Sequence, residues 1–522
     1  MVEFCIMSTD NQRDLTPVVP RKYRAVFFLL VSCFALWGLL NNMTDNLVPS
    51  FQKIFTLSQE QAGLVQVAFY GAYAVLAIFA SILIEEFSYR VGVLIGLGIY
   101  VLGALLYIPA CGWQSFDTYF IAIFIVAGGC SLLETTCNPY VLSLGDPKTG
   151  VRRLNFAQAF NPLGSLMGIV LAQQLILGNL NPATAEERQL MDPQTLDGIV
   201  SNELFWLGAP YVGLCAIALI MWVCFLRSKT EEQKPAGAET SRGGGLRVLI
   251  AALFSFVPLG LLYWYDPEMD KVQWILLGML GPIAYICIVG SYRSMLVGLL
   301  KAPRYWCGVI AQFFYVGVQI AAWTWMNVYC QKELGVAPDT AASYYVIALC
   351  FFILCRWIAT YYMKKFNPAS MMSIFAVGAI LCCLGVMYLP SDVLFSIGGL
   401  PFSANVIFLV LMSGCMSLMF PTIYGIALGG LDQRILKLGA AGLIMAILGG
   451  AIITPWMAGI IGNVDSSWAS LVSGFDTTWD SNLKTSSTLL RASFIVPAIC
   501  FAVVLVYSLI FRKPAVPQAE EK

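Results

Sequence analysis

Two carboxyl groups inside long apolar stretches are the residues of this sequence whose type and position most directly imply chemistry. Asp45 lies in NNMTDNLVPSF, and Glu134 lies in GGCSLLETTCNPYV. A carboxylate within a bilayer is costly unless it meets water, a partner or a proton, so such residues usually mark the route of an ion or a substrate. The sequence contains no histidine, the side chain that ordinarily titrates near neutral pH. Protons that move through this chain must therefore be carried by carboxyl groups.

The composition places the chain in a membrane. Of 522 residues, 59% are hydrophobic and 11% are charged, and the mean hydropathy is +0.76. A soluble domain carries about 25% charged residues. We therefore expect an all-α polytopic membrane protein in contact with lipid. The formal net charge of zero gives no indication of nucleic-acid binding.

Enzyme chemistry has little support in this sequence. The sixteen cysteines form no CxxC pair, and no histidine is available as a catalytic base or a ligand. We expect most of the cysteines to be small buried hydrophobic residues. No metal site, cofactor or catalytic residue is predicted. A polytopic membrane enzyme is therefore disfavoured, and the soluble stretches are too short for the signalling domain of a membrane sensor.

Fourteen apolar stretches are long enough to cross a bilayer core, which takes about 20 helical residues. They fall into groups of six, two and six. The predicted spans are 25–48, 61–84, 91–110, 117–144, 155–177, 204–226, 246–264, 273–291, 304–330, 341–363, 369–389, 402–428, 438–462 and 491–511.

The loops predict the domains and the orientation. Basic residues gather in alternate loops, which predicts that both termini lie in the cytoplasm. A polar linker rich in Gly and Pro separates the halves. The predicted parts are a cytoplasmic tail (1–24), a six-helix bundle (25–226), a cytoplasmic linker (227–245), an extra transmembrane hairpin with a connecting loop (246–300), a second six-helix bundle (301–512) and a cytoplasmic tail (513–522).

Polar residues of the first bundle cluster on helix faces. Asn41 and Asn42 lie one turn before Asp45, on the same face. Asn138 lies one turn after Glu134 and precedes a proline. The alternative is that Asp45 sits solvated at the outer interface, and that Glu134 caps carbonyls freed near the proline. We expect instead that Asp45 and Glu134 are proton-coupling and substrate-binding residues, with Asn41, Asn42 and Asn138 beside them.

Amide side chains also mark the fifth and ninth predicted spans. Gln158 and Asn161 are spaced by three residues, and Gln312, Gln319 and Trp323 form a stripe on one face of an apolar helix. Amides donate and accept hydrogen bonds at once, which suits a neutral ligand with many hydroxyl groups. Helix–helix hydrogen bonds, and a tryptophan facing lipid, are the structural alternatives. We expect all five residues to bind substrate.

One arginine inside a span has a structural interpretation. Arg356 lies near the end of the predicted span 341–363. Its position predicts a side chain that extends to the cytoplasmic interface.

The two halves resemble one another weakly. ETTCNPYVLSLGD ends the fourth span, and SLMFPTIYGIALGGLD ends the corresponding span of the second half. Each has a proline within the helix, and each is followed by a glycine-rich span. This correspondence predicts a pseudo-two-fold relation between two bundles, as in transporters with internal repeats.

Together the segments resemble the L-fucose:proton symporter family within the major facilitator superfamily. The matching stretches are NNMTDNLVPSFQKIF, LSQEQAGLVQVAFYGAYAV, LETTCNPYV, RLNFAQAFNPLGS, AQFFYVGVQIAAW, FPTIYGIALGGL and GGAIITPWMAG, in order along both halves. The resemblance implies the major facilitator fold, one central sugar site and alternating access. It also implies that Glu134 matches the family's proton-coupling glutamate and Asp45 its sugar-recognising aspartate. The hairpin departs from the family's pattern.

The expected function is therefore the import of a monosaccharide, L-fucose first, with a proton, by a monomeric carrier. A glucose/galactose or N-acetylglucosamine carrier of the same family is the alternative. Coupling to sodium, or no coupling, also remains open at this stage.

Overall fold

The helical elements follow the predicted spans closely. The computed structural model describes residues 17–45, 47–55, 57, 59–183, 187–188, 190–228, 244–266, 271–462 and 486–513. Three predicted segments lie mostly outside the described residues: the N-terminal tail (1–16), the linker (229–243) and the C-terminal tail (514–522). Within them, thirteen helices are long and apolar enough to cross a membrane, or fourteen if one bent pair counts as a span. The predicted all-α membrane class is confirmed.

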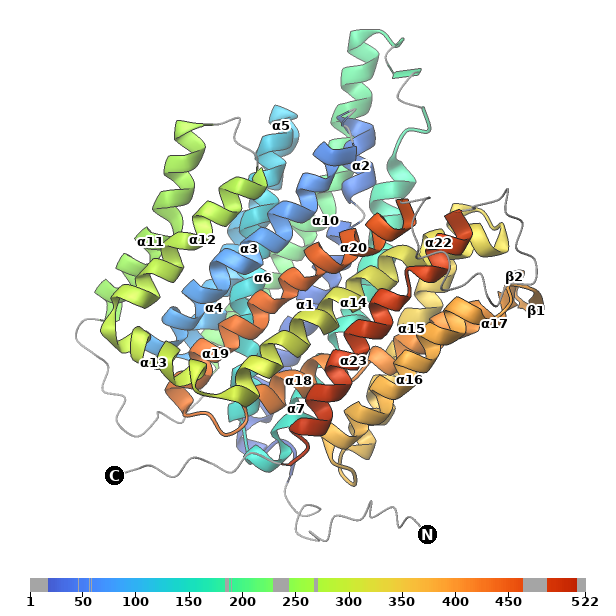
Figure 1. Ribbon diagram of the computed structural model, residues 1–522. Coiled ribbons are helices and arrows are strands. Elements are labelled where there is room, and N and C mark those ends of the chain that lie inside the picture. The colour runs from blue at the N-terminus through green and yellow to red at the C-terminus, as the bar shows by residue number, and fades with distance from the viewer. Residues whose placement is uncertain are drawn as a thin grey trace, which may run out of the picture.

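The first half contains the elements before the linker (Figure 1). They are η1 (Arg21–Tyr23), α1 (Arg24–Asp45), α2 (Leu47–Ile54), α3 (Gln59–Glu86), α4 (Tyr89–Leu105), α5 (Tyr107–Trp113), α6 (Phe116–Ser143), η2 (Pro147–Thr149), α7 (Gly150–Gln158), α8 (Asn161–Leu171), η3 (Ala172–Ile176), η4 (Leu177–Asn179) and α10 (Pro193–Arg227).

The hairpin and the second half follow. The hairpin comprises α11 (Gly244–Tyr265), α12 (Lys271–Ile288) and α13 (Gly290–Leu300). The second half comprises α14 (Pro303–Leu334), α15 (Pro338–Tyr362), α16 (Pro368–Tyr388), β1 (Val393–Ile397), β2 (Leu400–Ser403), α17 (Ala404–Met416), α18 (Met419–Leu428), α19 (Gln433–Met445), η5 (Ala446–Leu448), α20 (Gly449–Gly462), α22 (Ser486–Ala492) and α23 (Ile495–Ile510).

Local sequence explains where many helices begin. Proline occupies the first position of α10, α14, α15 and α16, where its missing N–H costs nothing. Side chains cap others: the Ser88 oxygen accepts from the Val91 N–H, and Asn367 accepts from the Ala369 N–H. These caps fix the turns between consecutive spans.

One hydrophobic cluster fills the first half and extends into the hairpin, α18 and α19, and a second cluster lies within the second half. Close helix pairs occur at equivalent places in both halves. In the first half α1 packs on α8, where a Cβ on Gly164 would lie 1.9 Å from the Ala35 carbonyl oxygen. In the second half α14 packs on α20, where a Cβ on Gly449 would lie 2.0 Å from the Phe313 carbonyl oxygen. Only glycine permits such backbone contacts. The glycine-rich fifth and thirteenth predicted spans therefore serve matching roles in the two halves.

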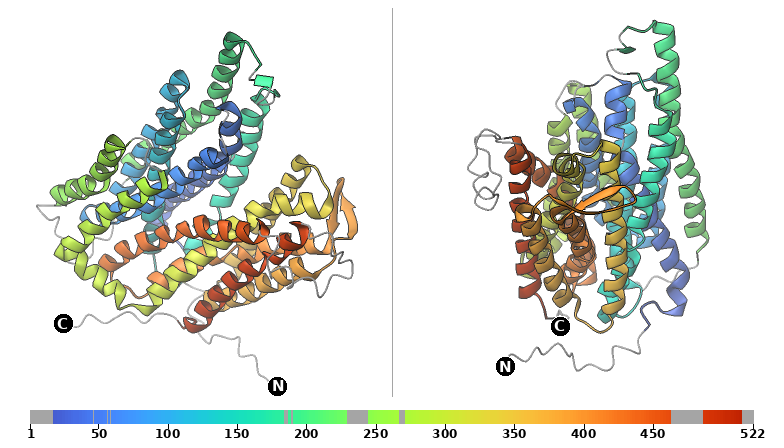
Figure 2. Two further views of the ribbon diagram at one scale, coloured as in Figure 1. Left: turned by 45° about the horizontal axis from the view of Figure 1, so that its top comes forward. Right: turned by 90° about the vertical axis from the view of Figure 1, so that its right-hand side faces the viewer.

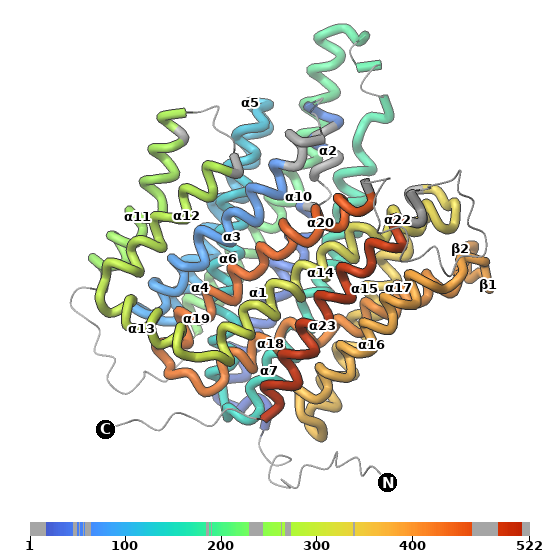
Figure 3. Tube along the Cα trace, in the orientation of Figure 1, coloured from blue at the N-terminus to red at the C-terminus, as the bar shows by residue number. Residues whose placement is uncertain are grey.

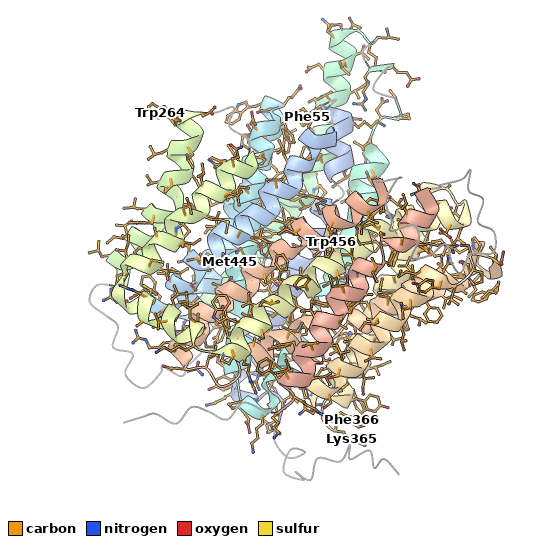
Figure 4. All side chains as sticks on the ribbon, viewed as in Figure 1. Phe55, Trp264, Lys365, Phe366, Met445 and Trp456 are labelled. Atoms are coloured by element: carbon orange, nitrogen blue, oxygen red, sulfur yellow. The ribbon has the colours of Figure 1, made fainter. Side chains whose placement is uncertain are left out.

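The elements run between two ends of the molecule, which we name the basic end and the opposite end. The basic end gathers Arg24, Arg90, Arg152, Arg434 and Arg512, at the ends of their helices. Figure 4 shows Lys365 at this end and Trp264, the exposed tip of α11, at the opposite end. The two side views of Figure 2 show that the long helices of both halves extend between these ends.

The hairpin packs mainly on the first half. Helices α11 and α12 contact α3, and the Trp274 ring lies 5.4 Å from the Phe124 ring of α6. The predicted span near 273–291 corresponds to α12, which ends at Ile288, and the chain then turns by 97° into α13. The predicted connecting loop is largely a helix, which crosses the basic end and contacts α19 of the second half (Figure 3).

A second feature that the sequence interpretation did not include is the small β-hairpin β1–β2, whose strands pair antiparallel. Gly398 and Gly399 form its turn, with φ of 59° and 84°. Such backbone conformations favour glycine strongly, which explains the GG pair.

One buried carboxyl group fastens the hairpin. The Tyr292 hydroxyl donates to Glu86 Oε1 at 2.7 Å, and Arg247 Nη1 donates to the same atom at 3.2 Å. Glu86 has 7% of its side chain exposed, whereas Arg247 has 43% exposed. The neighbouring residue, Glu85, instead pairs with Arg434 and Lys437 of α19, at 2.7 and 3.2 Å.

We predict that Glu86→Ala loosens the hairpin, because it removes the shared acceptor of Tyr292 and Arg247. The loss should be about 1.5–3 kcal/mol, the usual range for hydrogen bonds to a charged group. Thermal unfolding of the purified protein in detergent would show this as a lower midpoint. Arg293→Gln, on the exposed side of α13, is the matched control and should unfold like the parent; equal midpoints for all three proteins would contradict the prediction.

Candidate functional site

A cavity of about 440 Å³ lies between the two halves, within the usual range for small-molecule sites. Its first wall comes from α1, α3, α6 and the α7–α8 region, and its second wall comes mainly from α14 and α15. Seven of the ten predicted site residues line it: Asn41, Asn42, Glu134, Gln158, Asn161, Gln319 and Trp323.

The cavity is sealed toward the basic end. There Glu85 of α3 binds α19, and Asn155 Nδ2 of α7 donates to Thr422 Oγ1 of α18 at 3.3 Å. Toward the opposite end the wall residues Gln66, Gln173 and Thr324 are exposed. Only one hydrogen bond joins the halves at that level in the described part of the chain, from the Tyr345 hydroxyl to Asn42 Oδ1 at 2.8 Å. The cavity is therefore reached from the opposite end.

Glu134 is the acidic side chain in the wall of this cavity. It lies well inside the 28-residue helix α6 and is 6% exposed. None of the ion pairs among the described residues includes it. Tyr73, from α3, lines the same cavity. A carboxylate placed this way, with no cation beside it, requires water, a proton or a polar ligand to offset its desolvation.

The amides of the first wall are tied to the protein in different ways. Gln158 Nε2 donates to Asn138 Oδ1 at 2.8 Å, and Asn138 Nδ2 donates to the Glu134 carbonyl at 3.0 Å. With its amide oxygen turned toward α1, Asn161 accepts from Trp37 Nε1 at 2.7 Å. Asn138 thus lies behind the wall, fully buried, and supports Gln158 from there.

The second wall combines amides with aromatic rings. Gln319, Trp323 and Asn327 present one face of α14 to the cavity. The Trp323 ring packs edge-on to Tyr345 at 5.7 Å, and its Nε1 donates to Ser413 Oγ at 3.2 Å. This bond fixes the orientation of the indole ring. A rigid aromatic surface beside amides suits a ligand that has both apolar C–H faces and hydroxyl groups.

Two further predicted site residues have different positions. Gln312 is fully buried on α14 and does not line the cavity, although Val316, one turn along, does. Asp45 is the last residue of α1, but its side chain lies outside the described residues.

Arg356 corrects the sequence interpretation, which placed it at the interface. It is 3% exposed and lines the cavity. Its Nη1 donates to the Gln158 carbonyl at 2.9 Å, its Nε donates to the Ser417 carbonyl, and its guanidinium lies 4.5 Å from the centre of the Phe352 ring. It therefore binds one carbonyl from each half.

Prolines explain why these two carbonyls are available. In an uninterrupted helix the Gln158 carbonyl would accept from residue 162 and the Ser417 carbonyl from residue 421, but both of these residues are prolines and have no N–H. Arg356 fills both vacated positions with its planar set of donors. Within a membrane such freed carbonyls require a partner. The arginine thereby fastens the two halves together at the floor of the cavity.

Some residues of the cavity wall were not predicted from the sequence. Gln66, Tyr73, Gln173, Thr324 and Tyr345 all line the cavity. Gln66 and Gln173 carry a usable signal, since each is an amide within an apolar stretch. The tyrosines carry none, because tyrosine is common both in helix packing and at membrane interfaces.

A model of the Major Facilitator Superfamily matches residues 26–452. The chain belongs to the Major Facilitator Superfamily. Its most similar relatives include two L-fucose-proton symporters. That of Haemophilus influenzae is 34% identical over 94% of this chain and 97% of that protein. That of Escherichia coli K12 is 30% identical over 94% of this chain and 93% of that protein. The predicted resemblance to the L-fucose:proton symporter family is confirmed, and these relatives are transporters rather than enzymes.

Other relatives and solved structures agree with this placement. The glucose/galactose transporter of Brucella abortus is 24% identical over 97% of this chain and 98% of that protein. The crystal structure of FucP, a Major Facilitator Superfamily transporter in the outward conformation, has a TM-score of 0.70 at 30% identity and covers 95% of this chain and 100% of that one. The predicted fold is confirmed.

We predict that Arg356→Lys weakens the junction between the halves, because an ammonium group cannot donate to two divergent carbonyls with the geometry of a guanidinium. Hydrogen–deuterium exchange should become faster in α7 and α18. Arg304→Lys is the matched control, since the Arg304 side chain donates to the Lys513 carbonyl and lies 5.6 Å from the Phe511 ring, away from the junction between the halves. Unchanged exchange in Arg356→Lys, or an equal rise in the control, would contradict the prediction.

Proposed function

We propose that this protein imports a monosaccharide together with a proton, and that L-fucose is the sugar. The observation that carries the proposal is Glu134, an unpaired buried carboxyl group in a cavity that opens toward one end only. Amides from both halves and the Trp323 ring share this cavity. The similarity to L-fucose-proton symporters over nearly the whole chain supports the choice of sugar and ion.

In this mechanism the sugar enters from the opposite end, which we assign to the outside. The amides donate to and accept from its hydroxyl groups, and the Trp323 ring packs on its C–H face. A proton on Glu134 removes the cost of a buried charge, so that the outer side can close. Contacts of the sugar that differ between the two states then bias the exchange between them. No covalent step is required.

The remaining assignments belong to the same proposal. Both termini lie in the cytoplasm, as the basic residues indicate, and the protein is a monomer in the inner membrane. The functional divisions are the bundles 25–226 and 301–512, joined by the linker and the hairpin 246–300. Asp45 takes part in sugar recognition, and Asn41 and Asn42 extend the same face of α1.

A glucose/galactose carrier is the second candidate. It is favoured by relatives of that description that are 24% and 26% identical over most of the chain. A competition panel in proteoliposomes would decide between them. We expect L-fucose, and sugars of the same hydroxyl configuration such as L-galactose and D-arabinose, to inhibit uptake of labelled L-fucose. Inhibition by D-glucose and D-galactose alone would favour the second candidate instead.

We predict that Glu134→Gln separates sugar movement from proton movement, since the amide keeps the size of the side chain but cannot release a proton. Exchange of labelled for unlabelled sugar should continue, whereas accumulation driven by a proton gradient should be lost. Both can be measured in the same proteoliposomes. Full accumulation by this variant would refute the role of Glu134.

We predict that Asp45→Ala abolishes uptake of L-fucose, because the sugar would lose a charged hydrogen-bond acceptor. The measurement is uptake of labelled sugar at equal amounts of inserted protein. Asn46→Ala, at the next position of the chain, is the control and should retain uptake. Normal uptake by Asp45→Ala would return Asp45 to a solvated position at the outer interface.

A further inference from the structure

We group as one layer the buried polar side chains that α7, α14 and α18 carry on the basic-end side of the cavity, where α18 contacts both α14 and α7. It contains Asn155 of α7, Gln312 of α14, and Thr422 and Tyr424 of α18, all with 0% exposure. Helices α7 and α18 meet here across the boundary between the halves, and a Cβ on Gly425 would lie 2.9 Å from Val151 Cγ2. This layer is thus enclosed in the tight contact that closes the cavity.

Several atoms of this layer make no hydrogen bond within the described part of the chain. Neither the amide oxygen nor the amide nitrogen of Gln312 has a partner, and the same holds for the Tyr424 hydroxyl and Asn155 Oδ1. Burying such a group without a partner is unfavourable. A leucine of similar volume would fill the position of Gln312 at lower cost. The polar atoms are therefore unexplained by the packing of this closed arrangement.

The position of Gln312 suggests when its amide is used. It precedes Gln319 by seven residues, so both lie within about 20° on one face of α14 and about 10 Å apart along its axis. Gln319 and the intervening Val316 line the cavity. The Arg356 junction, which binds the carbonyl of Gln158 in the first half, closes the floor at this level. Separation of the halves at the basic end would extend the wall from Gln319 down to Gln312.

We propose that Gln312, Asn155 and Tyr424 form a second sugar-binding position, used only when the transporter is open at the basic end. In that state their donors and acceptors contact the hydroxyl groups of the departing sugar. Several polar atoms of this layer are buried without a protein partner in the closed arrangement, and this cost is recovered when the cytoplasmic side opens. This inference rests on the proposed function, because it takes the same sugar as the ligand of both positions.

The test compares the two sides of the membrane in Gln312→Leu. Transport is measured in right-side-out vesicles and in inside-out vesicles, which present the outer and the cytoplasmic side respectively to labelled L-fucose. We expect the half-saturating sugar concentration to change less than about twofold at the outer side. It should rise about five- to tenfold at the cytoplasmic side, the change expected for one lost neutral hydrogen bond. Tyr424→Phe is a second variant with the same expected pattern and minimal change in volume.

Gln319→Leu is the matched control on the same helix face, and it should weaken binding at the outer side. Thermal unfolding in detergent supplies a readout besides transport: Gln312→Leu should unfold at a higher temperature than the parent, because an unpaired buried amide is removed. Lower stability together with unchanged cytoplasmic affinity would overturn the inference in favour of a purely structural role. An equal loss at both sides would overturn it in favour of a single site. If the parent transports none of the sugars tested, the proposed function itself fails, which is a distinct outcome.

Discussion

The arrangement of this molecule depends on one acidic side chain enclosed by apolar helices. Glu134 has no cation beside it among the described residues, and its ring of amides and aromatic groups leaves room for a polar ligand. A fixed negative charge there would be unfavourable in a closed protein, and a proton removes it. In the proposed function, the same carboxyl group links the occupancy of the cavity to the state of its gates.

The gates are built from hydrogen bonds that proline makes possible. Pro162 and Pro421 interrupt two helices, one in each half, and the carbonyls they free are held by the single guanidinium of Arg356. Below this junction, Glu85 contacts α19 while the adjacent Glu86 holds the extra hairpin. Two adjacent residues at the end of α3 thus connect the first half to the second half and to the hairpin. Opening at the basic end has to break the contacts of Arg356 and Glu85, whereas the contacts of Glu86 stay on one side.

Much of the fold was predictable because long apolar runs, prolines and basic loops report directly on helices that cross a membrane. All fourteen predicted spans have a counterpart, including the two of the hairpin. The bend after Ile288 was missed because residues 289–291 were interpreted as the end of the span and the following residues, up to 300, as a loop. The β-hairpin was missed because its strands are short and lie outside the apolar periodicity.

The site was predictable only in part, for a physical reason. Amides and carboxyl groups inside apolar helices stand out in a sequence, and seven of the ten selected residues share one cavity. A sequence does not show which residues of other helices a side chain contacts. Arg356 was placed at the interface because the carbonyls it binds belong to other helices, and Gln312 was placed in the site because helix periodicity gives its face but not its depth. Asn138 was likewise on the correct face, but its amide is hydrogen-bonded to Gln158 and to the backbone.

The most direct test of the account is the pH of the outer medium when L-fucose is added to cells or vesicles that contain the protein and carry no other fucose carrier. The account predicts that adding the sugar makes the unbuffered medium more alkaline, equally with and without sodium, as protons enter with it. Sugar uptake with no change in pH, or uptake that depends on sodium, would contradict the assignment of Glu134 as the carrier of the coupled proton.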